Sequence, residues 1–130
     1  MLKRIHHIGV AVADIESARR VVEEQLGLEE TRRHRAPDGS SDAAFYRCGD
    51  VEIELLYFKE PERRSAWLAG AQQARIEHIA IEVDDLEETT RALSALGIQS
   101  LAPVRGPLGI SARTDPATSG GVVYQLLQKD

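Results

Sequence analysis

The sequence is short of cysteine, of positive charge and of long apolar runs. Its single cysteine, Cys48, cannot form a disulfide within the chain, which suits a reducing compartment. Its 16 lysines and arginines stand against 21 aspartates and glutamates, and the net charge of −5 argues against a nucleic-acid surface. The apolar run after Arg4 extends only from Ile8 to Ala13, too short for a signal peptide or a membrane span. We therefore expect a cytoplasmic protein with no nucleic-acid or membrane partner.

What the sequence does contain is an internal repeat. Residues 4–16 return as residues 75–87, at an offset of 71 positions, and seven of the thirteen positions are identical, where chance would give roughly one. The identical pairs are Arg4/Arg75, Ile5/Ile76, His7/His78, Ile8/Ile79, Val12/Val83, Asp14/Asp85 and Glu16/Glu87. We interpret residues 1–130 as one domain made of two half-modules, residues 4–57 and 75–127.

The same offset holds at the end of each half-module. Residues 51–56 lie over residues 122–127, and Glu54 falls on Gln125 without a gap. Each half therefore carries two potential metal ligands: a histidine near its start, which is His7 or His78, and a glutamate or glutamine near its end.

Apolar periodicity and turn residues predict the order βαβββ in each half. The expected strands are 5–13, 28–33, 43–48 and 51–57, then 76–83, 98–104, 110–114 and 121–127. Asp14 and Asp85 are expected to cap helices that end at Gly27 and Gly97, and Leu96 is placed in the buried stripe of the second helix. A short helix is expected around residues 66–68. The fold class is therefore α+β, with two tandem βαβββ modules forming a cupped mixed β-sheet.

Strand alternation separates two faces of each half. His7 and Gly9 share one face of the first strand, whereas Val10 and Val12 share the other, and we expect the helices to cover Val10, Val12, Ile79 and Ile81. If the first and last strands of a half are neighbours, the ligands of that half stand side by side. If the halves also pair about a pseudo-twofold axis, all four ligands meet in one cup. Two imidazoles, a carboxylate and a carboxamide suit a divalent ion such as Co²⁺, Mn²⁺, Ni²⁺, Zn²⁺ or Fe²⁺.

Other polar residues receive simpler interpretations. Cys48 is expected to be a small buried apolar residue rather than a nucleophile, and His34 is expected to face solvent. Asp42 and Glu52 are the next carboxylates to consider if a second acid or base is needed.

The segments beginning at His7 and His78, Glu54 within its Glu-Ile-Glu-Leu-Leu strand, and Ser119-Gly-Gly-Val-Val resemble the vicinal oxygen chelate superfamily. Within it, the sequence is most similar to the methylmalonyl-CoA epimerases. The resemblance implies a glyoxalase-like fold, a bound divalent metal ion, a small-molecule substrate such as an acyl-CoA, and a homodimer. The epimerases take His, Gln, His and Glu from the four ligand positions, whereas this sequence has His7, Glu54, His78 and Gln125.

The implied reaction is removal of the proton α to a metal-chelated carbonyl by a carboxylate, and an epimerase also needs a proton donor on the opposite face. Glu54 is the only carboxylate among the four ligands, so it is expected to be the catalytic base, a metal ligand, or both in alternation, whereas Gln125 cannot accept a proton. A His-Pro-Lys segment common in the epimerases is here Asp115-Pro116-Ala117, so a basic group that would meet coenzyme A is missing.

Three alternatives stay open on the sequence alone, because this fold serves several chemistries. One is a glyoxalase-like lyase. Another is an Fe²⁺ dioxygenase that uses His7, His78 and Glu54 as a set of two histidines and one carboxylate. The last is a non-enzymatic binding protein of the bleomycin-resistance kind, which would need no metal ligands.

Overall fold

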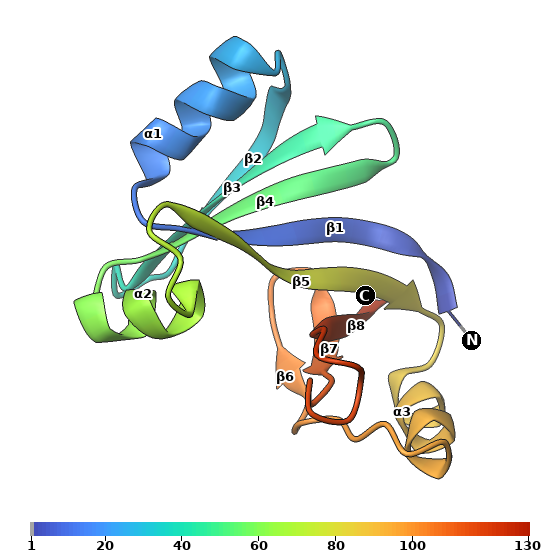
Figure 1. The fold of residues 1–130 in the computed structure, drawn as a ribbon. Helices are drawn as coiled ribbons and strands as arrows, with labels where there is room; N and C mark the ends of the chain where they lie inside the picture. The colour runs from blue at the N-terminus through green and yellow to red at the C-terminus, as the bar shows by residue number, and fades with distance from the viewer. Residues whose placement is uncertain (1) are drawn as a thin grey trace. The chain divides into compact units, whose positions relative to one another are not determined.

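The computed structural model describes residues 2–130, which form two compact units, residues 7–77 and residues 78–130 with 2–6. The first half-module contains β1 (Leu2–Val12), α1 (Ile15–Arg20) with a π-helical turn η1 (Val21–Gln25), β2 (Glu29–Arg35), β3 (Ser41–Cys48) and β4 (Val51–Phe58). Helix α2 (Pro61–Leu68) follows. The second half-module contains β5 (Ala74–Val83), α3 (Leu86–Ala95), β6 (Val104–Arg105), β7 (Gly109–Arg113) and β8 (Tyr124–Lys129) (Figure 1). The predicted order βαβββ is confirmed in both halves.

The two halves use the same strand pairing. In the first half the strand order is β2-β3-β4-β1, and β1 runs parallel to β4 with Gly9 opposite Glu54. In the second half the order is β6-β7-β8-β5, and β5 runs parallel to β8 with Ala80 opposite Gln125. Both members of the second pair lie 71 positions after their counterparts, so the repeat seen in the sequence is also a repeat in register.

Each half has its own apolar core beneath a helix. In the first half the buried cluster is Val12, Val22, Ala44, Tyr46 and Leu55, with Val10 packed against it. This confirms that Val10 and Val12 lie on the helix side of the sheet. In the second half the buried cluster is Val83, Leu86, Ala112 and Leu126. Ile79 and Ile81, on the same side of β5 as Val83, are half-buried.

Aspartates begin both long helices, as predicted. Asp14 accepts hydrogen bonds from the backbone N–H groups of Glu16 and Ser17, and Asp85 accepts one from the N–H of Glu88. These bonds satisfy N–H groups that have no partner within a helix. No helix among residues 2–130 is long and apolar enough to cross a membrane.

Three expectations for less regular parts of the chain are wrong, and they concern residues 98–103, Leu96 and Cys48. Residues 98–103 are not a strand, because the pairing there is limited to one isolated bridge, Ser100 with Thr114, and the strand β6 begins only at Val104. Leu96 is 75% exposed, since it follows the last turn of α3, and Thr89 is buried in its place. The hydroxyl of Thr89 donates to the carbonyl of Asp85, which makes its burial tolerable.

Cys48 is exposed rather than buried. It ends β3, directly before the turn at Gly49 and Asp50, and therefore lies beyond the sheet region that α1 covers. His34 is exposed, as expected.

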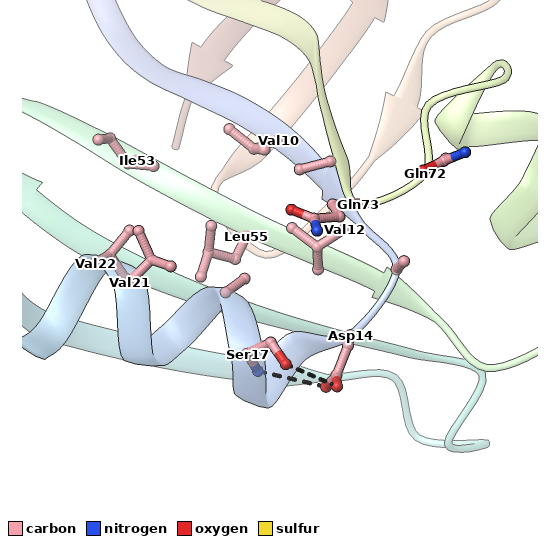
Figure 2. A pocket seen from close by; sticks show the side chains of 13 residues that line it. Val10, Val12, Asp14, Ser17, Val21, Val22, Ile53, Leu55, Gln72 and Gln73 are labelled. Carbon is pink, nitrogen blue, oxygen red and sulfur yellow. Dashed lines mark hydrogen bonds between the residues drawn. The ribbon is translucent and has the colours of Figure 1, made fainter. Parts of the chain in front are cut away.

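A cavity of about 480 Å³ lies between α1 and the sheet of the first half (Figure 2). Aliphatic side chains form most of its wall, including Val10, Val21 and Ile53. Because Val10 and Ile53 belong to the helix side, the cavity lies on the face of the sheet opposite His7 and Glu54.

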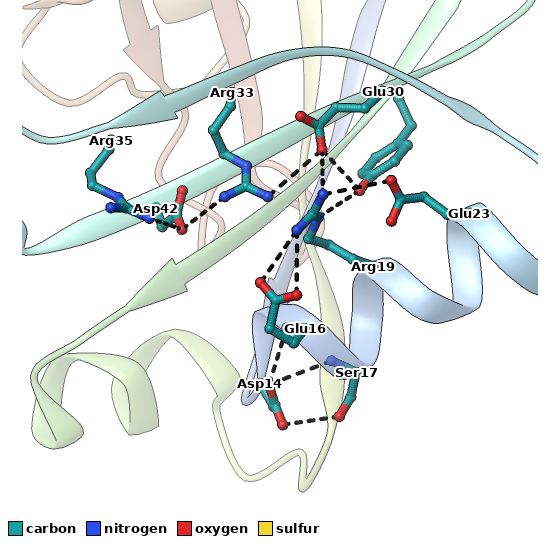
Figure 3. Close-up of polar contacts among 10 residues, drawn as sticks. Asp14, Glu16, Ser17, Arg19, Glu23, Glu30, Arg33, Arg35 and Asp42 are labelled. Carbon is teal, nitrogen blue, oxygen red and sulfur yellow. Dashed lines mark hydrogen bonds and ion pairs between the residues drawn. The ribbon is translucent and has the colours of Figure 1, made fainter.

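Hydrogen bonds and ion pairs also connect helix α1 to strands β2 and β3 (Figure 3). Arg19 donates from Nε to the hydroxyl of Tyr46 and from Nη2 to Glu30. The hydrogen bond to Tyr46 raises the pKa of Arg19, and burial raises the pKa of Tyr46. The guanidinium and the phenol therefore stay cationic and neutral, respectively, at ordinary pH.

Candidate metal and substrate site

His7 and Glu54 stand side by side in the first half. Parallel pairing of β1 and β4 brings the His7 Nε2 atom within 3.5 Å of Glu54 Oε1. The side chain of His7 is 4% exposed and that of Glu54 is 13% exposed, so both are largely removed from solvent. An imidazole nitrogen next to a carboxylate oxygen forms half of a metal site, or a proton-transfer pair.

His78 and Gln125 occupy the equivalent positions in the second half. His78 is buried in β5, and Gln125 lies on the neighbouring strand β8. The Nε2 atom of Gln125 donates to the hydroxyl of Ser111 at 3.1 Å. The Oε1 atom of Gln125 is buried and accepts no hydrogen bond from the part of the chain that the structure describes. Such an atom is costly unless something binds it.

These observations fit a divalent cation. The amide of Gln125 is fixed with its nitrogen turned to Ser111, which leaves its oxygen for an ion. His7, Glu54 and His78 are side chains of the types that hold metal ions, and their histidines are buried. One negative charge and three neutral donors suit first-row divalent metals.

The face of the first half that carries His7 and Glu54, called here the ligand face, is crossed by a row of paired residues. Arg32 lies opposite Phe45, Phe45 opposite Glu54, and Glu54 opposite Gly9, on the strands β2, β3, β4 and β1. Residues directly opposite one another in a sheet share a face. The guanidinium carbon of Arg32 lies 3.7 Å from the centre of the Phe45 ring, and the Phe45 and His7 rings meet in a T-shaped contact.

Glu52 shares the ligand face, but both of its oxygens are engaged. Arg32 Nη2 donates to one oxygen at 2.9 Å and the hydroxyl of Thr31 donates to the other at 2.5 Å. Successive strand residues normally point to opposite faces, and a bulge between Glu30 and Arg32 lets both neighbours reach one carboxylate. Both oxygens of Glu52 are therefore engaged within the first half, which argues against Glu52 as a second acid or base.

Asp42 does not lie on the ligand face. It is opposite Tyr57 and has the parity of Ala44 and Tyr46, which belong to the helix side. Ion pairs with Arg33 at 3.4 Å and Arg35 at 3.3 Å hold it there (Figure 3). Asp42 is therefore excluded as a base opposite Glu54.

Sequence reasoning missed Phe45 and Ser111 in this region, and it considered Arg32 only as one of four scattered arginines that could attract an anionic substrate. Each lies on a strand that carries no proposed ligand, and each reaches a ligand only through strand register. The signal that would have found them is the pairing of β3 with β4 and of β7 with β8, and the internal repeat does not reveal it.

The family described as the glyoxalase/bleomycin resistance protein/dioxygenase superfamily matches residues 6–112. The chain belongs to this superfamily. The mitochondrial methylmalonyl-CoA epimerase of Homo sapiens is 28% identical over 135 residues, which cover 98% of this chain and 74% of that protein. This relative is an isomerase, which agrees with the expectation that the chain is an enzyme.

Solved structures agree with the fold. A hypothetical protein, BH1468, from Bacillus halodurans has a TM-score of 0.87 and 28% identity over 98% of this chain and 94% of its own. Methylmalonyl-CoA epimerase from Mycobacterium tuberculosis has a TM-score of 0.86 and 21% identity over 99% of this chain and 89% of its own. The predicted glyoxalase-like fold, built from two βαβββ modules in a mixed sheet, is confirmed.

Proposed function

We propose that this member of the superfamily is a divalent-metal-dependent epimerase that acts on an acyl-CoA of the methylmalonyl-CoA type. The observation that carries the proposal is the identical register of two ligand pairs, His7 with Glu54 and His78 with Gln125. The similarity to a named methylmalonyl-CoA epimerase supports the choice of reaction.

In this proposal His7, Glu54, His78 and Gln125 bind one ion, which is Co²⁺, Mn²⁺, Ni²⁺, Zn²⁺ or Fe²⁺. When bound, the ion would polarise the substrate carbonyl and stabilise the negative charge that develops as the α-proton leaves. His7 and His78 are each buried, and Ser111 holds the carboxamide of Gln125 in one orientation.

Glu54 is the proton acceptor in this mechanism. It is the only carboxylate of the four ligands, and its partner on the neighbouring strand is Gly9, which has no side chain. Glu52 is paired with Arg32, and Asp42 lies on the helix side, where it is paired with Arg35. Neither is therefore placed to accept the substrate proton. Transfer of the proton to Glu54 leaves an enolate, and return of a proton from Glu54 to the same face exchanges the α-hydrogen with solvent. Epimerisation requires instead that a donor other than Glu54 protonates the opposite face.

Three further features of the proposal come from analogy with the family. The substrate carries coenzyme A even though Ala117 stands where the epimerases have lysine, the working assembly is a homodimer, and the location is cytoplasmic. Sedimentation at micromolar concentration tests the second of these, and a monomer there would contradict it.

The test is solvent-deuterium exchange into methylmalonyl-CoA. The protein is stripped of metal with a chelator and reloaded with each of the five metals in turn. Deuterium incorporation into the substrate is then measured by mass spectrometry. We expect exchange only after reloading. A protein that exchanges no deuterium with any of the five metals would not be an epimerase of this substrate.

A second candidate is an Fe²⁺ dioxygenase, because a His7–Glu54 pair plus a further histidine is the ligand set of such enzymes. Oxygen consumption by the iron-loaded protein, together with absent exchange, would favour it. A glyoxalase-like lyase and a metal-free binding protein have no specific observation in their favour.

A further inference from the structure

The two ligand pairs share a backbone register, so the repeat by itself does not determine which half carries the carboxylate. On β1 and β5 each of the two unlike ligands stands opposite a small residue, a glycine or an alanine, which favours neither a charged nor a neutral ligand. The strands on the other side differ. β3 places Phe45 opposite Glu54, whereas β7 places Arg113 opposite Gln125.

Arg113 lies on the same face of the second half as Gln125. Ala112 and Leu126 belong to the buried cluster on the helix side, so strand alternation turns Arg113 and Gln125 to the opposite face. Residues directly opposite one another in an antiparallel pair have Cβ atoms about 4.5–5.5 Å apart. Arg113 is half-buried, and its carbonyl accepts the N–H of Leu101 at 2.8 Å, which holds its backbone in the sheet. Its guanidinium therefore starts within reach of a side chain at position 125.

A neutral carboxamide at position 125 is not engaged by this arginine. Ser111 accepts the hydrogen bond from the nitrogen of Gln125, and the buried Oε1 atom accepts none from residues 2–130. An ionised carboxylate in the same place would attract the guanidinium and accept two parallel N–H···O bonds. Carboxylate oxygens engaged in this way are not available to take a proton from a substrate, as with Glu52 in the first half.

Glu54 has an apolar residue at the corresponding place. Phe45 is 5% exposed, and its ring carries no hydrogen-bond donor. The guanidinium that lies over this ring belongs to Arg32, whose Nη2 atom donates to Glu52 at 2.9 Å. The strand neighbour of Glu54 therefore does not draw its carboxylate into an ion pair.

We propose that Arg113 determines which half-module supplies the proton acceptor: it would capture a carboxylate at position 125 and so confines that role to Glu54. This inference rests on the proposed function and adds a positioning residue to it. Arg113 acts through the choice of ligand, and it contacts neither the reacting atoms nor the ion in this assignment. One arginine on a strand without a ligand thereby makes two halves of equal register unequal in chemistry.

The experiment moves the carboxylate to the second half. The variant that combines Glu54→Gln with Gln125→Glu, called here the exchanged-ligand variant, is loaded with metal, and its deuterium exchange into methylmalonyl-CoA is measured with and without Arg113→Met. Arg105→Met in the same background is the matched control. Arg105 also belongs to the second half, but it lies on the helix side and pairs with Asp130 at 2.6 Å.

We expect the exchanged-ligand variant to exchange deuterium slowly, and we expect Arg113→Met to raise its rate about 10-fold or more, because the new carboxylate is then released from its ion pair. Arg113→Lys should raise the rate less, since it keeps the charge but loses the planar fork. Arg105→Met should change the rate less than about twofold, because an exposed ion pair contributes little.

A second measurement uses metal-free protein and needs no turnover. Urea unfolding is followed for the parent protein, Gln125→Glu, Arg113→Met and the combination of the last two. An ion pair predicts that Gln125→Glu shifts the equilibrium toward the folded state about threefold more when Arg113 is present than when it is replaced. A purely structural role predicts no such coupling, because Arg113→Met would then destabilise both backgrounds equally. The same curves show whether each variant folds.

No rise in exchange on adding Arg113→Met to the exchanged-ligand variant, or no coupling between the two positions in metal-free protein, would overturn the role of Arg113. Failure of the proposed function is a different result, in which the metal-loaded parent protein exchanges no deuterium into methylmalonyl-CoA. That result overturns both proposals, whereas exchange by the parent protein without an effect of Arg113→Met overturns this inference alone.

Discussion

The two halves of the molecule share a backbone register and differ in the side chains around it. Gly9 opposite Glu54 in the first half becomes Ala80 opposite Gln125 in the second. The paired position on the next strand is Phe45 in the first half and Arg113 in the second. The repeat therefore determines where a ligand stands, whereas the non-repeated strands determine what surrounds it.

The outer strands differ most. β2 has seven residues and a bulge that brings Thr31 and Arg32 to the ligand face, whereas β6 has only two residues, Val104 and Arg105. The first half consequently offers a carboxylate with a neighbouring cation. The second half offers a carboxamide held by a hydroxyl. In the proposed function the first half therefore supplies the proton acceptor, and the second half supplies neutral ligands for the ion.

The largest expected effect comes from exchanging the two unlike ligands. Glu54→Gln removes the only charged ligand and the proton acceptor, so metal affinity should fall and deuterium exchange should drop about 100-fold or more even at saturating metal. Gln125→Glu should keep or tighten the metal. The double variant should bind metal again, because it restores one carboxylate to the set. Metal content by elemental analysis and exchange by mass spectrometry measure both effects.

These variants separate the two roles of Glu54. If saturating metal restores exchange in Glu54→Gln, the carboxylate is only a ligand. If Glu54→Gln binds metal and exchanges deuterium like the parent protein, Glu54 is neither the charged metal ligand nor the proton acceptor.

Much of this architecture was predictable because the repeat carries it. The offset of 71 residues located both helices and their aspartate caps, and the same offset appears in the strand register of the two proposed ligand pairs. Period-2 alternation also assigned Val10 and Val12 to the helix side correctly. Because the same local pattern occurs in both halves, each assignment was supported by two segments of the sequence.

The errors fall where tertiary pairing overrides local preference. Residues 98–103 have strand-like composition, but Pro103 has no N–H to donate to a neighbouring strand, and the chain there stays irregular. The contacts that Arg32 and Ser111 make depend on the register between neighbouring strands, which a single sequence does not specify. The bulge at Thr31 shifts the register of β2 by one residue, which simple alternation would have misplaced.

A smaller effect is expected from Ser111, the residue that fixes Gln125. Ser111→Ala removes the hydroxyl that receives the Gln125 amide, so the carboxamide can rotate and present nitrogen to the ion. Losing a partner that orients a ligand typically weakens metal binding about 10- to 100-fold. Competition with a coloured chelator measures this change.

The matched control lies in the first half. Ala43 is opposite Leu56 as Ser111 is opposite Leu127, so the two positions correspond in register. Ala43→Ser adds the hydroxyl beside Glu54, which as a carboxylate needs no partner to define its oxygens. We expect little change in metal affinity, and equal effects at both positions would mean that Ser111 acts through general packing.

The smallest effect concerns the helix caps and depends on pH. Asp14 accepts a hydrogen bond from the Ser17 hydroxyl at 2.9 Å as well as from backbone N–H groups. The Ser17 hydroxyl is the main cause that lowers the pKa of Asp14 below its ordinary value of 3.8. In the second half the residue corresponding to Ser17 is Glu88, which gives Asp85 a backbone N–H but has no hydroxyl.

Because the pKa of Asp14 is lower in the folded state than in the unfolded chain, its ionised carboxylate stabilises the fold. That contribution is complete above pH 3.8 and is lost as the pH falls through the lowered pKa. Asp14→Asn keeps an acceptor oxygen and removes the charge, so it should reduce the free energy of unfolding at pH 7 and should reduce it less at a pH well below 3.8, where the carboxylate becomes protonated. Urea unfolding at both pH values measures the difference, and NMR titration of Asp14 in Ser17→Ala should show its pKa rising toward the ordinary value. If Asp14→Asn costs the same stability at both pH values, the hydroxyl of Ser17 is not what distinguishes the two caps.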